Sequence, residues 1–162
     1  MREQDGEHPW GDTGQLIFLL FFLVVWAGDS FFLRGSTFGS AYLPLFIRLL
    51  ITAFVMIIAV YLAKAGHAVA NHEGRPPGVV STRAFRYVRH PLYLASLLFY
   101  FGLAVSTACL FSFGLLLVIF FFYDCIASYE EKLLEGKYGE DYLHYKKTTG
   151  KWFPRFKPIR KA

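Results

Sequence analysis

Two polar segments of the chain contain the residue types that could do chemistry. The first reads RPPGVVSTRAFRYVRHPLY over residues 75–93 and places His90 directly before a proline. The second reads YDCIASYEEKLLEGKYGEDYLHY over residues 123–145 and contains the adjacent acids Glu130 and Glu131. An imidazole and carboxylates can hold hydroxyl or ammonium groups and can move protons. Long apolar runs adjoin both segments, so these runs must supply the elements that position the polar side chains.

The composition is typical of a membrane protein. Of the 162 residues, 55% are hydrophobic and 18% are charged, whereas soluble domains contain about 45–50% apolar and about 25% charged residues. This length allows one compact domain, which we expect to span residues 1–162. The net charge of +5 would suggest a nucleic-acid partner in a soluble protein. The basic residues here lie beside apolar runs, so we expect them to orient the chain in a membrane and expect no nucleic-acid partner.

The apolar runs predict an all-α integral membrane protein. The first run has the length of one bilayer crossing. Because the residues before it are not basic and no clean cleavage site follows, we favour a retained helix over a signal peptide. The stretch between Pro91 and Ala127 is too long for one crossing of a core about 30 Å thick. It is expected to form a tight hairpin that turns at residues 106–109. The four expected spans are 16–33, 43–63, 91–106 and 109–127.

The distribution of basic residues predicts the topology. They are concentrated in the connecting loop at 64–90 and the C-terminal segment at 128–162, and such segments stay in the cytoplasm. Both termini and the candidate site are therefore expected on the cytoplasmic side. The membrane would be the inner or plasma membrane of a prokaryote or the endoplasmic reticulum of a eukaryote. Tyr138, Tyr142 and Tyr145 recur at helical spacing, which predicts an amphipathic helical tail with these rings on one face.

Charged residues and glycines within the expected helices need separate consideration. Arg48 lies near the start of the second span and is expected to extend toward the nearer interface. Asp29 and Asp124 are acids within or near the membrane, and each is either a functional group or an interfacial acid bonded to a neighbouring helix. Gly136 and Gly139 are expected to break or bend the helix that continues from the fourth span.

The two polar segments are expected to face each other across one pocket. Proline is favoured at the first position of a helix, so His90 should lie at the start of the third span, with Tyr93 one turn deeper. Glu130 and Glu131 are the first acids past the fourth span, at the same membrane depth. A glutamate pair alone is more often a solvated face. The shared depth favours a site with an imidazole on one wall, carboxylates on the other and an opening to lipid.

These motifs resemble those of a known family. FRYVRHPLY at 85–93 resembles the R-H-P-x-Y signature of integral-membrane methyltransferases, which include isoprenylcysteine carboxyl methyltransferases and phospholipid N-methyltransferases. The glutamate pair with KYGEDYLHY at 137–145 is similar to the companion element, and NHEGRPP at 71–77 to the preceding loop. The resemblance implies S-adenosylmethionine (SAM) as the methyl donor and a group of cofactor-binding residues, namely Arg86, Tyr87, Val88, Arg89, His90, Tyr93, Glu130, Glu131 and Tyr142.

The resemblance also implies a reaction. The expected acceptor is a lipophilic molecule, such as an isoprenylcysteine-type carboxylate or a phospholipid amine, reached from the membrane lipids. The expected catalytic residues are His90, Glu130 and Glu131. An amine must lose a proton, so a glutamate could act as its base, whereas a carboxylate is already ionised. No metal is expected, because cysteine and histidine show no zinc-type spacing. The alternatives are an NADPH-dependent membrane reductase of the steroid or sterol type and a non-enzymatic membrane scaffold.

Overall fold

The computed structural model describes residues 11–70 and 78–155, so predictions for the remaining residues, including the N-terminus, the loop at 71–77 and the end of the tail, lie outside it. Its described residues contain helices and one isolated bridge between Val88 and Gly150, but no strand, which confirms the all-α class. The elements in order are α1 Gly11–Ala27, η1 Gly28–Leu33, η2 Thr37–Ala41, α2 Leu45–Ala70, η3 Arg83–Arg86, α3 Pro91–Thr107, α4 Leu110–Tyr138 and α5 Glu140–Thr148.

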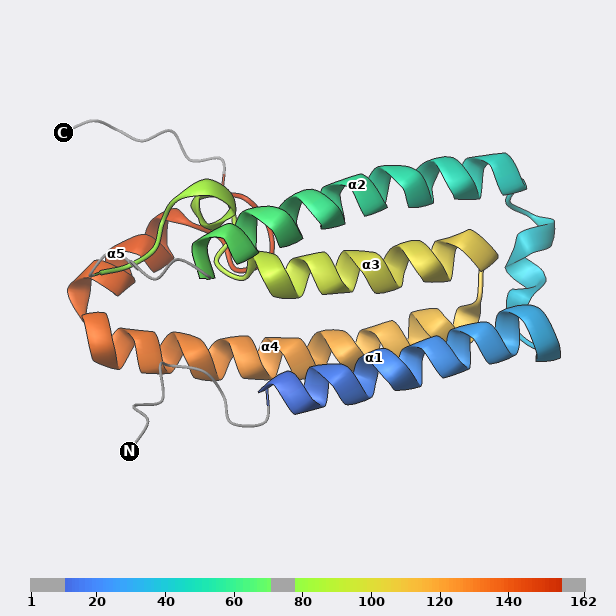
Figure 1. Ribbon diagram of the computed structural model, residues 1–162, viewed down its shortest axis with the longest axis horizontal. Coiled ribbons are helices and arrows are strands. Elements are labelled where there is room, and N and C mark those ends of the chain that lie inside the picture. The colour runs from blue at the N-terminus through green and yellow to red at the C-terminus, as the bar shows by residue number, and fades with distance from the viewer. Residues whose placement is uncertain (1–10, 71–77, 156–162) are drawn as a thin grey trace.

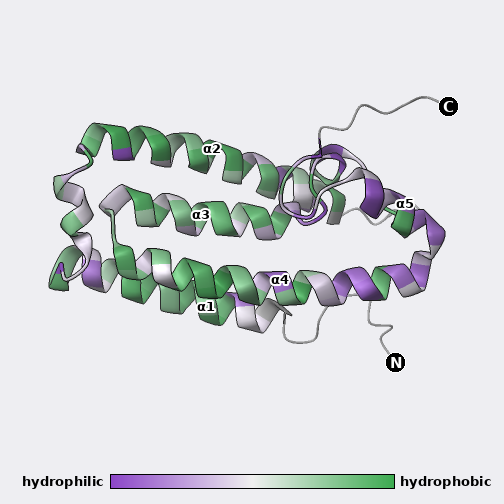
Figure 2. Cartoon of the chain, turned by 180° about the vertical axis from the view of Figure 1, so that it is seen from behind, coloured by the Kyte–Doolittle hydropathy of each residue, from purple (hydrophilic) through white to green (hydrophobic). Residues whose placement is uncertain are grey.

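The four long helices run side by side as an elongated bundle. Figure 1 shows α1 along α4 and α2 along α3, with α5 at the end where α2 stops and α3 begins. We call this the α5 end and the opposite end, where α3 turns into α4, the turn end. Hydrophobic residues cover most of α1 to α4, and polar residues gather toward the α5 end (Figure 2). The candidate site motifs lie at this polar end.

Three helical segments are long and apolar enough to cross a membrane. They are Thr13–Leu33, Leu45–Val69 and Leu110–Tyr138, whereas Pro91–Thr107 is shorter. The count of four spans therefore stays a prediction. The chain does leave the helix after Thr107, at the expected turn, where Ala108 adopts a left-handed conformation with φ 53°.

Two predicted boundaries were wrong. Helix α2 continues to Ala70, so the first part of the expected loop at 64–90 is helical. Helix α4 passes through Gly136 without a break and ends only before Gly139, whose φ of 53° lies in the left-handed region that glycine tolerates. A glycine inside a helix weakens it only modestly, so Gly136 alone could not end α4.

Glycines bring α2 and α3 close together. A Cβ atom built on Gly66 would lie 2.7 Å from Leu92 Cδ2, and one on Gly102 would lie 2.8 Å from Met56 Cε. Small residues allow such close approach of membrane helices. The contact at Gly66 places the end of α2 level with the first turn of α3.

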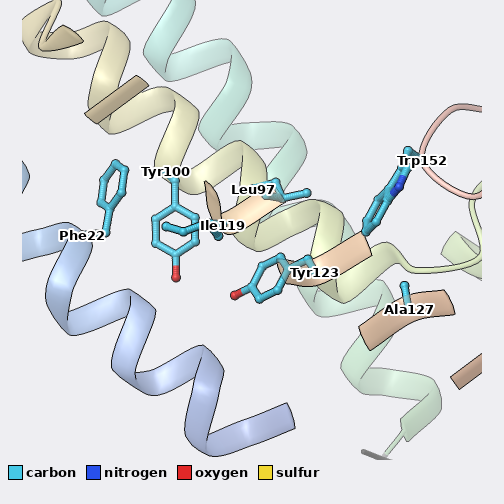
Figure 3. Close-up of a cluster of buried hydrophobic side chains, with 7 residues drawn as sticks. All are labelled: Phe22, Leu97, Tyr100, Ile119, Tyr123, Ala127 and Trp152. Atoms are coloured by element: carbon cyan, nitrogen blue, oxygen red, sulfur yellow. The ribbon is translucent and has the colours of Figure 1, made fainter. Parts of the chain in front are cut away.

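Aromatic side chains join α1, α3 and α4 in the core. The ring centroids of Phe22 and Tyr100 lie 4.7 Å apart, and Figure 3 shows Tyr100 between Phe22 and Tyr123. Trp152, which follows α5, packs into the same cluster and so anchors the C-terminal segment to the bundle. The whole cluster consists of Phe22, Leu97, Tyr100, Ile119, Tyr123, Ala127 and Trp152.

The turn end is held by a buried carboxylate. Asp29 Oδ1 accepts hydrogen bonds from the backbone N–H groups of Gly35 at 2.9 Å and Ser36 at 3.2 Å. Its Oδ2 accepts from Ser36 Oγ at 2.6 Å and from Cys109 Sγ at 3.2 Å. Asp29 thus joins the end of the first span to the turn between α3 and α4.

Arg48 binds backbone carbonyl groups at the turn end. Its side chain is buried and donates to the carbonyl oxygens of Leu43 at 3.1 Å and Ser106 at 2.8 Å. Ser106 lies in the last turn of α3, where carbonyl groups lack partners within the helix. Arg48 therefore stabilises the end of α3.

We expect Asp29→Ala to lower the midpoint of thermal unfolding in lipid nanodiscs, because it leaves the N–H groups of Gly35 and Ser36 without their acceptor. Asp29→Asn keeps one carbonyl oxygen and should lower the midpoint less. Equal midpoints for the wild type and Asp29→Ala would contradict this role.

Candidate active site

The beginning of α3 is tied to the residues that follow α5. Pro91 is the first residue of α3 and His90 directly precedes it, which confirms the predicted helix start. Just before it, the backbone N–H of Arg89 donates to the carbonyl of Gly150 at 2.9 Å. From α5, Tyr145 Oη donates to the carbonyl of Phe85 at 2.6 Å. These bonds fix the segment before α3 against the C-terminal part of the chain.

Glu131 is at the centre of a buried ion network. Its Oε1 accepts from Arg89 Nε at 2.9 Å and from His90 Nε2 at 3.2 Å, and its Oε2 lies 3.3 Å from Lys146 Nζ. The Nη1 of Arg89 donates to the carbonyls of Lys146 at 3.1 Å and Thr149 at 2.6 Å. Only 4% of Glu131 is exposed, so this carboxylate links α4, α5 and the start of α3 within the protein.

Burial sets the protonation of the side chains around this network. It lowers the pKa of His90, while the hydrogen bond with Glu131 acts in the opposite direction. His90 is therefore neutral at pH 7, and its Nε2–H can donate to Glu131. Burial raises the pKa of Tyr142 and Tyr145, so both phenols stay protonated.

Glu130 has a different environment from its neighbour. Its Oε1 accepts from Tyr93 Oη at 2.5 Å, and its Oε2 lies 3.7 Å from His90 Nδ1. The rings of His90 and Tyr93 are stacked with centroids 5.7 Å apart, and Tyr93 stacks on Tyr123 at 5.3 Å. Glu130 thus lies beside a row of aromatic rings.

A cavity of about 820 Å³ extends from this row toward the membrane-spanning segments. Its polar part is lined by Arg89, His90, Tyr93, Glu130 and Tyr142. Its apolar part is lined by side chains of α1, α2 and α3, among them Leu16, Leu19, Met56, Ala59, Val60 and Phe99. One cavity therefore joins a polar site to an apolar channel.

The structure brings together some of the predicted site residues and separates others. Arg89, His90, Tyr93, Glu130 and Tyr142 line the cavity. Glu131 lies behind this wall and holds it through its ion network. The remaining residues, Arg86, Tyr87 and Val88, do not line the cavity: the first two are exposed and the third is buried elsewhere.

The tyrosine stripe was predicted on one helix, and that prediction was wrong. Gly139 divides it, so that Tyr138 ends α4 and the other two belong to α5. All three tyrosines nevertheless line the cavity, because the turn at Gly139 folds α5 back beside α4.

Asp124 contacts the C-terminal segment and is not among the residues that line the cavity. Its Oδ1 accepts from Lys151 Nζ at 2.5 Å and from Trp152 Nε1 at 2.8 Å. Trp152 in turn lies beside His90, with ring centroids 6.0 Å apart. Asp124 therefore positions an aromatic side chain against the site and does not extend the wall of the cavity.

Helices α1 and α2 supply walls of the cavity that no sequence motif indicated. Gln15, Met56 and His67 line the cavity but belong to no motif. A signal was present in α2, where the lining residues Met56, Val60, Ala63 and His67 recur at spacings of three and four.

The chain is similar to known methyltransferases over part of its length. Residues 40–141, more than half of the chain, match the family described as phospholipid methyltransferase. The Methanethiol S-methyltransferase 1 of Bradyrhizobium diazoefficiens is 29% identical over 92 residues, which are 54% of this chain and 32% of that protein. The chain thus aligns with about a third of the length of this relative. No solved structure matches. The family match over more than half of the chain shows that the protein belongs to the phospholipid methyltransferase family, and its three long apolar helices fit a membrane protein.

Proposed function

We propose that the protein transfers a methyl group from SAM to a lipophilic acceptor at the cytoplasmic interface of the membrane. The observation that carries this proposal is the continuity of the cavity, which has a carboxylate and aromatic rings at one end and apolar helix faces at the other. A polar cofactor and an apolar acceptor need such unlike surroundings within reach of each other.

The residues at the polar end fit SAM, which supplies an electrophilic methyl group on a sulfonium cation. The carboxylate of Glu130 can accept hydrogen bonds from hydroxyl or ammonium groups. The rings of Tyr93, Tyr138 and Tyr142 can face a cation. The volume of about 820 Å³ lies within the range of about 300–1,000 Å³ that is typical of small-molecule sites.

Different residues bind the ligand and position the site. Glu130 and Tyr93 face the cavity and would contact the cofactor. Glu131 and Arg89 neutralise each other's charge and hold the wall of the cavity in place. Trp152 packs beside His90 and helps to exclude water, which strengthens electrostatic interactions inside the site.

The acceptor would approach along the apolar part of the cavity. Leu16 and Leu19 from α1 and Met56 and Val60 from α2 offer it no polar partner, which suits a lipophilic molecule. In the proposed topology α3 also crosses the bilayer, since about 17 residues is the lower limit for a crossing. Both termini and the site then face the cytoplasm, as the basic segments favour.

The reductase alternative has little support from the site. A cofactor with several phosphates needs free cationic groups to bind them. Among the lining residues that the structure describes, Arg89 is the only lysine or arginine. Its Nε and Nη1 already donate to Glu131, Lys146 and Thr149.

Binding of labelled SAM to the full chain in lipid nanodiscs tests the donor. We expect saturable binding that NADPH does not displace. His90→Ala and Glu130→Gln should weaken it at least about tenfold, which corresponds to about 1.4 kcal/mol, because each removes a polar group at the cavity. NADPH binding without SAM binding would favour the reductase, and binding of neither would favour a scaffold.

The two adjacent glutamates should respond differently to the same substitution. Glu131→Gln leaves the buried charge of Arg89 without its partner and should lower the free energy of unfolding by about 3 kcal/mol. Glu130→Gln should leave thermal unfolding close to that of the wild type and reduce SAM affinity. Identical unfolding curves for the two variants would contradict this division of roles.

Partition of the methylated product tests the acceptor. With methyl-labelled SAM and a total lipid extract, we expect the label to move into the organic phase in the wild type. Val60→Arg places a charge in the apolar channel and should abolish this transfer while SAM binding persists. Transfer only to water-soluble molecules would contradict a lipophilic acceptor.

A further inference from the structure

We propose that His67 is the general base of the reaction, which takes a proton from the nucleophilic atom of a thiol or amine acceptor. This inference rests on the proposed methyl transfer and adds to it the chemical class of the acceptor. Neither of the two sequence motifs contains His67. It lies near the end of α2, on the wall of the cavity that α2 supplies.

The lining face of α2 changes from apolar to basic at His67. Met56, Val60 and Ala63 precede it on the same face of the helix. His67 follows Ala63 by one helical turn, which is about 6 Å along the axis. A molecule whose apolar part lies along this face would therefore bring its polar group beside the imidazole.

The packing of α2 against α3 determines where the imidazole of His67 lies along the length of the bundle. The neighbouring Gly66 lies against Leu92, which is in the first turn of α3. That turn also holds His90 and Tyr93 at the polar end of the cavity. His67 consequently lies at the level of the proposed donor site, but on the wall that α2 contributes.

The imidazole of His67 is available for proton transfer. Within the described part of the chain it forms no hydrogen bond or ion pair. By contrast, His90 and Glu130 are bonded to other side chains. The side chain of His67 is also exposed, so a proton that it accepts can pass on to water. Neutral imidazole is the common base at neutral pH.

The step balances without any further reactant. The lone pair of the acceptor sulfur or nitrogen forms the new bond to the methyl carbon as the bond from that carbon to the sulfonium sulfur breaks. The sulfonium becomes a neutral thioether. The proton of the acceptor goes to His67, which then carries the positive charge and releases the proton to solvent.

The cavity suits a protic acceptor better than a carboxylate. An ionised carboxylate needs no base and is stabilised by a cation. Arg89, the one arginine on the described lining, is already bonded to Glu131. A thiol, or an amine that is protonated at neutral pH, must lose a proton to expose its nucleophilic lone pair. Such an acceptor needs a base and no such cation, and His67 supplies that base.

Other titratable groups lie near His67. The effect of His67 on the transfer rate must therefore be separated from the effects of these groups. The exposed Arg83 and Arg86 lie on η3, which packs against α2. Across the cavity the titratable and charged groups on the described lining are Arg89, His90, Tyr93, Tyr100, Tyr123, Glu130, Tyr138, Tyr142 and Tyr145. A histidine elsewhere on the surface provides the matched control. His144 on α5 is exposed and does not line the cavity.

The test compares wild type, His67→Asn and His144→Asn in nanodiscs. SAM affinity is measured first, and methyl transfer is then measured with decanethiol, phosphatidylethanolamine and N-acetyl-S-farnesylcysteine as thiol, amine and carboxylate probes. We expect both variants to bind SAM like the wild type. His67→Asn should slow transfer to the thiol or the amine about 100-fold, whereas His144→Asn should leave it unchanged.

The pH profile distinguishes a base from a structural residue. The rate of His67→Asn should depend more steeply on pH than the rate of the wild type, because ionisation of the acceptor in solution must then replace the missing base. With the thiol probe, the rate of His67→Asn should keep rising toward alkaline pH and approach the rate of the wild type, because hydroxide then ionises more of the thiol without a base from the protein. A merely structural loss would persist at every pH.

Four results would overturn the proposal. His67→Asn could transfer at the wild-type rate, or its slower rate could persist at every pH. The protein could methylate only the carboxylate probe, or it could bind SAM and methylate none of the three. Failure of the wild type to bind SAM is a separate result, which would end the proposed function itself.

Discussion

The buried carboxylate of Glu131 is the interaction on which the α5 end of the molecule depends. A carboxylate that leaves water is stable only when close partners replace its hydration. Arg89, His90 and Lys146 do so, and Arg89 continues the network to the backbone of α5. The start of α3, the end of α4 and the C-terminal segment consequently share one charge network. Movement of any of them would leave a buried charge unpaired, so the wall of the cavity is held in one arrangement.

The same network explains why two adjacent acids have different environments. Successive positions on a helix are turned by about 100°, so the two side chains of the pair cannot face the same way. Glu131 points into the protein, where its charge is neutralised. Glu130 faces the cavity beside Tyr93, with its carboxylate at the polar end of the apolar channel. A charge in such surroundings interacts strongly with a cation, because little water is present to screen it.

Helix packing determines what lies opposite this carboxylate. At the close approach of α2 and α3, Leu92 packs on Gly66 and Met56 packs on Gly102, where a Cβ atom would clash. This packing sets the register of α2, so that the apolar face carrying Met56 runs along the channel and ends at His67. The proposed donor site and the proposed base are therefore placed by different elements, and the α2–α3 contact sets their relative depth.

The sequence by itself determined the helical class, the start of α3 at Pro91 and the turn that follows Thr107, because hydropathy and backbone chemistry are local properties. It also indicated that the histidine–proline and glutamate motifs share one site. Only the tertiary structure decided that Arg86 and Tyr87 lie outside the cavity and that His67 lines it. The physical reason is that hydrophobic residues cover most of helices α1 to α4, apart from the polar end of α4. Their hydropathy therefore does not reveal which face meets a neighbour, and packing alone selects it.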